Sequence, residues 1–348
     1  MAQRLFLIRS FSKFKRKLSS LNQYLALIII GLFYIIEFSF TLEVSRDPND
    51  VRFYLYPLQG DPLGKVELSM ELKNNLPVGD AEGWRLFKRD HVAVLMIHDF
   101  GLDLDSYEAQ LLKDAYLNSN IDGNYIIVDW GRHATPQQQP GETKPVNAKE
   151  DYQKAVDNVS MVGDRIGNFM VNMVKNGFIS STLIHLLGHG LGAHVAGRAG
   201  DTFQRLRGGS QIWRITGLDP AAPLFGISNP ARKLNRKDAY FVDTIHTDGG
   251  FQGDLSVHGH ADFYVNGGLH QPGCDDVNTL GLCSHNYAQQ IYIAAIQKPF
   301  VGCNCPPLLE ESELNDCLAQ CPNPAYLGPY VLIPTTTGPY YVVADNPP

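Results

Sequence analysis

The chain has 348 residues, with 29 Lys and Arg against 36 Asp and Glu, and its formal net charge is −7. Because phosphates and anionic lipids repel an acidic protein, the charge argues against nucleic acid and against an anionic membrane as electrostatic partners. An apolar fraction of 44% and a charged fraction of 19% are typical of a globular protein. The length suffices for one large α/β domain or two smaller ones.

The first 41 residues have the composition of an export signal. Met1–Lys17 carries six basic residues and no acidic one, and the uncharged apolar run Leu25–Ile36 follows. This run fits the centre of a signal peptide and is shorter than the ~18 residues of a membrane span. Residues 1–41 are therefore predicted to be a signal peptide, with an uncleaved signal anchor as the alternative. Removing their six basic residues and one acidic residue would leave residues 42–348 with a net charge of −12.

All cysteines lie in the last quarter of the chain, and their number is even. Behind an export signal this pattern predicts three disulfides. Zinc is the alternative, but Cys303-x-Cys305 lacks the usual spacing of a ligand pair. The sequence leaves the pairing of the last four cysteines open, with nested pairs as a guess. The six are Cys274, Cys283, Cys303, Cys305, Cys317 and Cys321.

The first half of the chain alternates buried strands with amphipathic helices. Apolar runs typical of a parallel sheet lie at His91–His98 and Tyr125–Trp130, and helical spacing is found at Asp105–Leu117 and Tyr152–Lys175. This order predicts a mostly parallel α/β sheet with right-handed crossovers. Asn158 fits a glycosylation pattern but lies within the last helix, so we interpret it as a helix residue. An edge strand is predicted at Arg52–Tyr56, β structure at Val66–Lys73 and an exposed loop at Gly131–Pro145.

The second half continues the strand pattern. The sequence predicts strands at Ile212–Leu218, Tyr240–His246 and Ala261–Val265, a loop at Gly267–Ser284, a helix at Asn286–Gln297 and a terminal β-ribbon at Tyr326–Tyr341.

The segment Ser181–Gly200 joins a strand to a helix through Gly188-His189-Gly190-Leu191-Gly192. Strand, tight glycine turn and helix form the context of the nucleophile elbow, G-x-S-x-G, of an α/β-hydrolase. Glycine-rich turns of this kind also bind phosphates or only pack closely, so the turn alone is a weak signal. An active hydrolase has serine at the centre of the motif, and here Gly190 stands there. The nucleophile position is therefore vacant.

The other parts of a hydrolytic site follow in the required chain order of nucleophile, acid and histidine. Asp219 ends a strand, where a buried carboxylate can orient an imidazole, and His285 follows the Cys274–Cys283 segment, where a mobile loop could carry it over the elbow. The backbone N–H groups of Phe100 and Leu191 would form an oxyanion hole. Taken singly, Asp219 could be a turn former and His285 a surface residue. His98, His189, His194 and His246 are interpreted as structural polar groups.

With these residues the sequence resembles the pancreatic-lipase family, particularly short insect-type members similar to phospholipases A1 that lack a C-terminal lipid-binding domain. The resemblance covers about residues 50–343. It implies that residues 42–348 form one α/β-hydrolase domain, that Asp219 and His285 are the acid and base of a triad, and that Cys274–Cys283 closes the base of a lid. The matching stretches are Val128–Trp130, Gly188–Gly200, Ile215–Pro223, Asp238–Gly249, Gly259–Tyr264, Asn266–Gly268 with Gln271–Cys274, and Cys283–His285.

The sequence departs from the family pattern at positions that would take part in catalysis or metal binding. Gly190 replaces the serine, and Asp99 stands where the family has glycine beside the oxyanion loop, so its charge would oppose a developing oxyanion. The segment between Cys274 and Cys283 has only eight residues. Around Pro230–Lys237 an acidic calcium ligand of the family is replaced by Asn235, so no metal and no cofactor are predicted.

The resulting hypothesis is a secreted, extracellular pseudoenzyme that does not hydrolyse esters efficiently. Its predicted partner is a lipid or another hydrophobic ligand that it binds or stores, with transient contact to a lipid surface as a further expectation. One alternative is an extracellular carboxylic-ester hydrolase of the triglyceride lipase or phospholipase A1 type, acting in lipid catabolism. Another is a membrane-anchored interaction protein that keeps residues 1–41.

Overall fold

The computed structural model describes residues 45–57, 64–69, 71–73, 76–78, 81–135, 148–225, 233–305, 311–331, 333 and 335–344, all within one compact unit. Its strands are β1 (Arg52–Tyr56), β2 (Val66–Glu67), β3 (Glu71–Lys73), β4 (Leu76–Val78), β5 (Ala93–Ile97), β6 (Asn124–Asp129), β7 (Ile184–His189), β8 (Arg214–Leu218), β9 (Phe241–His246), β10 (Ala261–Val265), β11 (Phe300–Cys303), β12 (Ala325–Leu327) and β13 (Gly338–Val342). Its α-helices are α2 (Ala81–Leu86), α3 (Tyr107–Leu117), α4 (Gly131–Ala134), α5 (Ala148–Lys175), α6 (Leu191–Leu206), α7 (Asp276–Thr279), α8 (Leu282–Gln297) and α9 (Glu311–Gln320).

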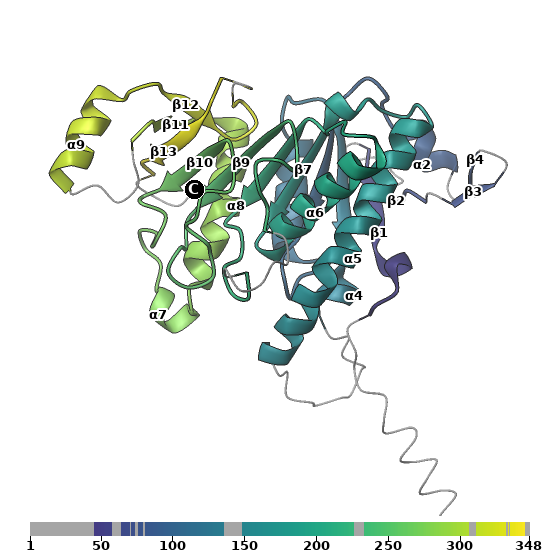
Figure 1. Ribbon diagram of the computed structural model, residues 1–348, viewed down its shortest axis with the longest axis horizontal. Coiled ribbons are helices and arrows are strands. Elements are labelled where there is room, and N and C mark those ends of the chain that lie inside the picture. The colour runs from purple at the N-terminus through teal and green to yellow at the C-terminus, as the bar shows by residue number, and fades with distance from the viewer. Residues whose placement is uncertain are drawn as a thin grey trace, which may run out of the picture. The chain divides into compact units, whose positions relative to one another are not determined.

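An 11-stranded sheet forms the centre of the molecule, in the order β12-β11-β13-β10-β9-β8-β7-β5-β6-β1-β2 (Figure 1). Strands β6, β5, β7, β8, β9, β10 and β13 run parallel, and antiparallel strands complete both ends. This architecture confirms the predicted α/β-hydrolase fold with a mostly parallel sheet. β3 and β4 pair separately as a two-stranded sheet.

Two apolar cores cover the two faces of the sheet. On β5, alternate residues face opposite ways: Ala93, Leu95 and Ile97 belong to one core, and Val94 and Met96 to the other. Helices α5 and α6, which lie side by side in Figure 1, contribute to the first core, whereas α3 and α8 contribute to the second. Because helices cover both faces, the central strands are apolar throughout rather than alternating.

Several predicted elements differ in their limits. β1 is not an edge strand, since the short β2 lies outside it, and Val66–Lys73 divides into β2 and β3 in different sheets. Gly131–Ala134 is a buried helical turn rather than an exposed loop, and residues 136–147 lie outside the described part.

In the second half of the chain, the loop predicted at Gly267–Ser284 contains α7 and the start of α8. The predicted terminal ribbon is also wrong, because β12 and β13 each pair with β11 and not with each other.

The six cysteines form three disulfides, Cys274–Cys283, Cys303–Cys321 and Cys305–Cys317. The predicted number is confirmed, and the last two pairs are nested. Asn158 is buried in α5 and its amide donates to the carbonyl oxygens of Ser45 and His133, which leaves no room for a glycan.

The predicted signal segment, residues 1–41, lies outside the described residues. Among the helices of the described part, none combines the length and the apolar character that crossing a bilayer requires.

Candidate functional site

The turn between β7 and α6 has the geometry of a nucleophile elbow. Gly190 adopts φ 54° and ψ −116°, a region that glycine enters freely and other residues only under strain. A side chain on Gly192 would overlap the carbonyl oxygens of Ile97 and His98, so the turn passes in direct contact with the end of β5. The glycines therefore let strand and helix approach closely, as the sequence predicts.

Asp219 follows β8 and is fully buried. Its Oδ1 accepts backbone N–H bonds from Thr247 at 2.8 Å and Asp248 at 3.0 Å. Its Oδ2 accepts the Nδ1–H of His285 at 2.6 Å. The carboxylate is thus fixed by two backbone donors and directed at one ring nitrogen, which holds the imidazole in a single orientation.

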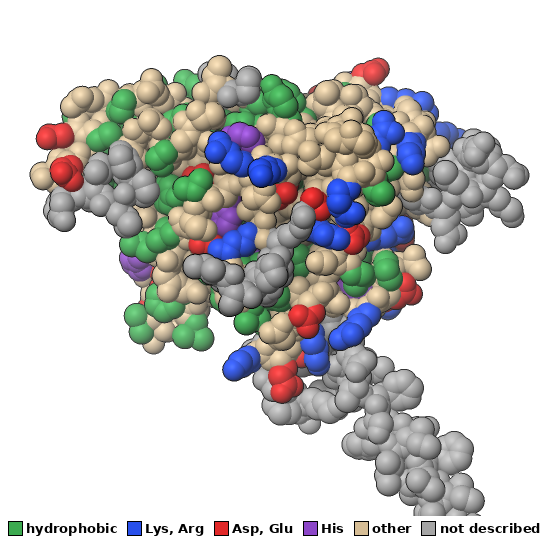
Figure 2. Space-filling model, in the orientation of Figure 1, with side chains coloured by type: hydrophobic (Ala, Val, Ile, Leu, Met, Phe, Trp, Pro, Cys, Tyr) green, Lys and Arg blue, Asp and Glu red, His purple; other side chains and the backbone are tan. Residues whose placement is uncertain are grey.

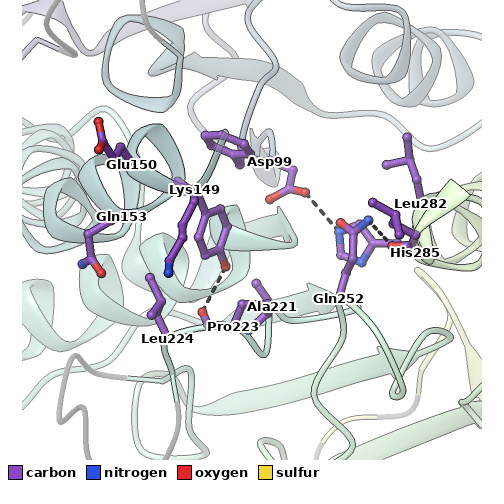
Figure 3. Close-up of a pocket in the computed structure, with 13 residues that line it drawn as sticks. Asp99, Lys149, Glu150, Gln153, Ala221, Pro223, Leu224, Gln252, Leu282 and His285 are labelled. Atoms are coloured by element: carbon purple, nitrogen blue, oxygen red, sulfur yellow. Dashed lines mark hydrogen bonds and ion pairs between the residues drawn. The ribbon is translucent and has the colours of Figure 1, made fainter. Parts of the chain in front are cut away.

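His285 lies in the first turn of α8 and is buried, so the expectation that a mobile loop carries it is wrong. The helix begins four residues earlier than the sequence pattern indicated, because Asp276 of α7 accepts the backbone N–H of Ser284 at 3.0 Å and thereby holds its first turn. The rigid placement leaves the Nε2–H of His285 pointing at the elbow, where it donates to Oδ2 of Asp99 at 3.0 Å (Figure 3).

Asp99 occupies the space that a side chain on residue 190 would need. A Cβ built on Gly190 would have Cγ, Oδ1 and Oδ2 of Asp99 within 3.0 Å, closer than such atoms approach. The other carboxylate oxygen, Oδ1, accepts the backbone N–H of Leu191 at 2.6 Å. Asp99 therefore engages both the base position, His285, and a predicted oxyanion donor, Leu191. The sequence identifies Asp99 as a departure, but its contact with His285 arises only from the fold.

These contacts keep His285 protonated and Asp99 ionised at neutral pH. Burial alone lowers the pKa of His285, but its hydrogen bonds to Asp219 and Asp99 outweigh burial and raise the pKa to about 10. Burial alone raises the pKa of Asp99, yet the hydrogen bond and positive charge of His285 lower it to about 2. Burial and the charge of His285 lower the pKa of the stacked His189 to about 4, so His189 is neutral. The site therefore holds one imidazolium between two carboxylates.

Asp248 is a further acidic residue of the site that sequence reasoning did not single out. Burial raises the pKa of its carboxyl group to about 7. Its Oδ2 accepts the backbone N–H of Gln252 at 2.9 Å, and its buried Oδ1 has no hydrogen-bond partner among the described residues. Its position just beyond β9, at the same sheet edge as Asp219, is the signal that could have found it.

A cavity of about 830 Å³ opens in front of Asp99 and His285 (Figure 3). One end of α5, the turns after β5, β8 and β9, and the start of α8 form its walls. Leu224, Leu280 and Leu282 stand at its exposed rim, with 42%, 71% and 50% of their surfaces accessible. Figure 2 shows hydrophobic side chains gathered beside this rim, over α7. The lining residues are Asp99, Phe100, Lys149, Glu150, Tyr152, Gln153, Ala221, Pro223, Leu224, Gln252, Leu280, Leu282 and His285.

Phe100, whose backbone N–H is predicted as an oxyanion donor, lies in this wall. Its ring packs edge-on against the ring of Tyr152, with the two ring centroids 5.2 Å apart. The Tyr152 hydroxyl donates to the carbonyl oxygen of Pro223 at 3.1 Å.

Polar side chains lie at both ends of the cavity, Asp99 and His285 beside the elbow and Lys149, Glu150 and Gln153 on α5 (Figure 3), and apolar side chains line much of the space between them. A cavity that combines apolar walls with a few polar groups is typical of a small-molecule site.

His285 belongs to two groups of side chains whose ligand atoms lie close enough together to hold a metal ion. The first group contains Asp99 and His189, and the second contains Asp219 and Asp248. Both ring nitrogens of His285 are already bound to carboxylates, so neither group offers it as a ligand without breaking these bonds. At Asn235, where the sequence predicts the loss of an acidic calcium ligand, the side-chain amide donates to the carboxylate of Asp238 at 3.0 Å, so its nitrogen faces the acid.

Four further histidines make structural contacts. His98 Nε2 accepts the backbone N–H of Trp130 at 3.1 Å, and His194 Nδ1 accepts that of Leu234 at 3.1 Å. His246 lies 3.0 Å from Asp262, and His189 bonds the backbone carbonyl of His285. All four are buried, in agreement with their interpretation as structural polar groups.

Comparison with known proteins finds lipases and a phospholipase among the relatives of this chain. The chain is 37% identical to human pancreatic lipase-related protein 3 over 184 residues, which cover 46% of this chain and 38% of the relative. It is 34% identical to rat phospholipase A1 member A over 239 residues, 65% of this chain and 48% of the relative. Chicken lipoprotein lipase is 29% identical over 294 residues, 78% and 52% of the two chains. The chain thus spans about a third to a half of these relatives.

The profile of the protein family described as Lipase matches residues 49–331, a range that includes the elbow, Asp219 and His285. The three disulfides agree with an extracellular lipase family of this kind. The chain belongs to the lipase family.

Proposed function

We propose that this protein binds one lipid or similar apolar ligand in the cavity beside His285 and does not hydrolyse esters efficiently. A secreted binding or storage role fits the vacant nucleophile position. The observation that carries the proposal is the position of Asp99. Its carboxylate stands where a residue-190 side chain would lie, and it bonds both His285 and Leu191.

Three elements of ester hydrolysis are blocked in this arrangement. Gly190 supplies no hydroxyl, and loss of the nucleophile costs about 10⁶-fold in kcat, or about 8 kcal/mol. An imidazolium has no free lone pair and cannot act as a general base, so His285 cannot activate water. The negative charge of Asp99 on the Leu191 amide would repel an oxyanion at that position.

Size and polarity of the cavity support an apolar ligand. A volume of about 830 Å³ lies within the range of cavities that bury most of a drug-sized molecule. The exposed leucines at the rim would contact the chain of a bound lipid, and at about 25 cal/mol per Å² their burial would favour binding. The charged groups at the inner end, Asp99 and His285, would face the polar end of the ligand.

Purified protein tests the proposal in an esterase assay with four matched forms: wild type, Asp99→Gly, Gly190→Ser and the double variant. Only the double variant should turn over p-nitrophenyl butyrate, because it has a serine and free space for it, with a gain on the order of 10³-fold. Gly190→Ser alone should stay inactive, since its side chain would collide with Asp99.

The wild type should bind the neutral apolar dye Nile red in the same preparation. Turnover by the wild type within a hundredfold of the double variant, or covalent labelling of the wild type by an organophosphate, would contradict the absence of hydrolysis. Failure of the wild type to bind any apolar probe would contradict the ligand-binding role.

A further inference from the structure

Asp99 combines the features of a nucleophile at a site that has lost its serine. Its side chain is 14% exposed, and it borders the apolar cavity directly (Figure 3). We propose that Asp99 is a carboxylate nucleophile that opens an epoxide ring on an apolar chain bound in this cavity. The inference goes beyond binding, and it rests on the proposed function only for the apolar occupant.

The contacts of Asp99 are those that such a nucleophile requires. Its Oδ1 accepts the N–H of Leu191 at 2.6 Å, the amide that would stabilise an oxyanion once the carboxyl carbon is attacked. Its Oδ2 lies 3.0 Å from Nε2 of His285, and Asp219 holds the opposite ring nitrogen at 2.6 Å. Nucleophile, histidine and acid therefore remain a connected set, with Asp99 in the place of a serine hydroxyl.

The chemistry of a carboxylate selects the substrate class. Attack on an ester carbonyl would form an anhydride, from which the carboxylate leaves more readily than the alkoxide, so the reaction returns to the ester. Attack on a ring carbon of an epoxide is different, because it forms a stable alkyl ester and releases ring strain. Asp99 can therefore act on an epoxide while the protein remains poor at hydrolysing esters.

In the first step an Asp99 oxygen forms a bond to one epoxide carbon, and the bond from that carbon to the ring oxygen breaks. The ring oxygen leaves as an alkoxide and takes the imidazolium proton of His285 through a water molecule in the cavity. The products of this step are an alkyl ester on Asp99, a hydroxyl group on the neighbouring carbon and a neutral His285.

In the second step water attacks the carboxyl carbon of the ester and gives a proton to neutral His285. The resulting oxyanion accepts the N–H of Leu191. It collapses by breaking the bond between the carboxyl carbon and the substrate oxygen, which takes the proton back from His285 and leaves as a diol. The Asp99 carboxylic acid then returns its proton to His285. The sum is epoxide and water to diol, and the carboxylate–imidazolium pair of the resting site is restored.

The test uses dodecene oxide, a terminal long-chain epoxide, with wild type, Asp99→Asn and His285→Asn. In His285→Asn the alkoxide of the first step has to take its proton from water, which slows ring opening, and the second step lacks its base. One alkyl adduct should therefore accumulate slowly on the peptide that contains Asp99. In wild type, turnover in oxygen-18 water should place heavy oxygen in the Asp99 carboxylate and produce dodecanediol. Asp99→Asn should give no alkyl adduct, no heavy oxygen at residue 99 and no dodecanediol. Asp105→Asn, at a surface carboxylate outside the cavity, is the matched control and should behave as wild type.

Displacement of Nile red separates this inference from the proposed function. The epoxide could displace the dye but leave Asp99 unalkylated in His285→Asn and free of heavy oxygen in wild type. This result would overturn the inference and leave ligand binding intact. Lack of displacement by the epoxide, with the dye still bound, would overturn the assigned substrate class. Thermal unfolding of each variant identifies one that fails to fold, and the heavy-oxygen measurement on wild type then decides the inference alone.

Discussion

At the scale of single residues, the proposed lack of ester hydrolysis depends on two residues that fit each other. Gly190 has no Cβ, and the carboxylate of Asp99 fills the space that a side chain at this position would need. Glycine at φ 54° also relieves strain of roughly 1–3 kcal/mol that a larger residue would store in the turn. Gly190 therefore lets the elbow keep its backbone conformation without a serine at this position.

The charge state of His285 predicts a pH dependence of stability. Its folded pKa is raised to about 10, above the unfolded value of about 6.5, so its contribution is fully present below about pH 6.5. The contribution is then lost as the pH rises through about 10, and the melting temperature of the wild type should fall over this interval. In Asp99→Asn one of the two carboxylates that raise the folded pKa is absent, so the fall should still begin near pH 6.5 but end at a lower pH than in wild type, with a smaller total loss.

Melting temperatures measured by circular dichroism from pH 6 to 10.5, together with the imidazole signals of His285 in NMR spectra, check this prediction. Identical pH profiles of wild type and Asp99→Asn, or neutral imidazole signals at pH 8, would contradict the carboxylate–imidazolium arrangement.

At the scale of elements, the carboxyl ends of parallel strands assemble the site. Asp99 follows β5, Gly190 follows β7, Asp219 follows β8 and Asp248 lies just beyond β9, so one sheet edge presents all four. This is the edge at which ligands bind in open α/β sheets. The start of α8 then adds His285 and the rim residue Leu282, which makes a rigid helix rather than a loop the last wall of the cavity.

The rim of the cavity predicts a selective effect on ligand binding. Leu282→Asp places a charge at the mouth, and binding of Nile red should weaken at least tenfold, or about 1.4 kcal/mol, since the aspartate must be desolvated beside an apolar ligand. Val301→Asp is the matched control, because Val301 on β11 is similarly exposed, 48% against 50%, and does not line the cavity.

Fluorescence titration of both variants with Nile red gives the two dissociation constants. Equal affinities of Leu282→Asp and Val301→Asp would show that the dye binds elsewhere on the protein.

At the scale of the whole molecule, the three disulfides divide into two roles. Cys274–Cys283 closes the segment that carries α7 and the rim residues Leu280 and Leu282. Cys303–Cys321 and Cys305–Cys317 enclose α9 and fix it to the end of β11. The first bridge therefore shapes the cavity, whereas the nested pair stabilises the end of the sheet.

Removal of single bridges should separate these roles. The loss of either Cys274–Cys283 or Cys303–Cys321, as double alanine variants, should cost about 3 kcal/mol of unfolding free energy, because each closes a loop in the unfolded chain. Only the first should also weaken Nile red binding. Urea unfolding and dye titration measure the two effects, and unchanged dye affinity in the Cys274/Cys283 variant would contradict its role at the cavity.

Much of the fold was predictable from local patterns. The apolar runs at β5, β6, β7 and β8 identify buried parallel strands, and their alternation with α3 and α5 determines the fold class. The limits of α4, α7 and α8 were not predictable, because contacts far along the chain set them. The hydrogen bond from the Ser284 N–H to Asp276 is one example, since it extends α8 to Leu282.

For the site, the sequence by itself determined which residues are present: a glycine at the elbow, and an acid and a histidine in the order of a hydrolase. Only the tertiary structure decided what they do to one another. Asp99 and Gly190 lie in different strand-to-helix connections, and β5 and β7 are neighbours only in the folded sheet. Since a charge changes the pKa of a group only when the two lie within a few ångströms, the imidazolium of His285 is a property of the fold.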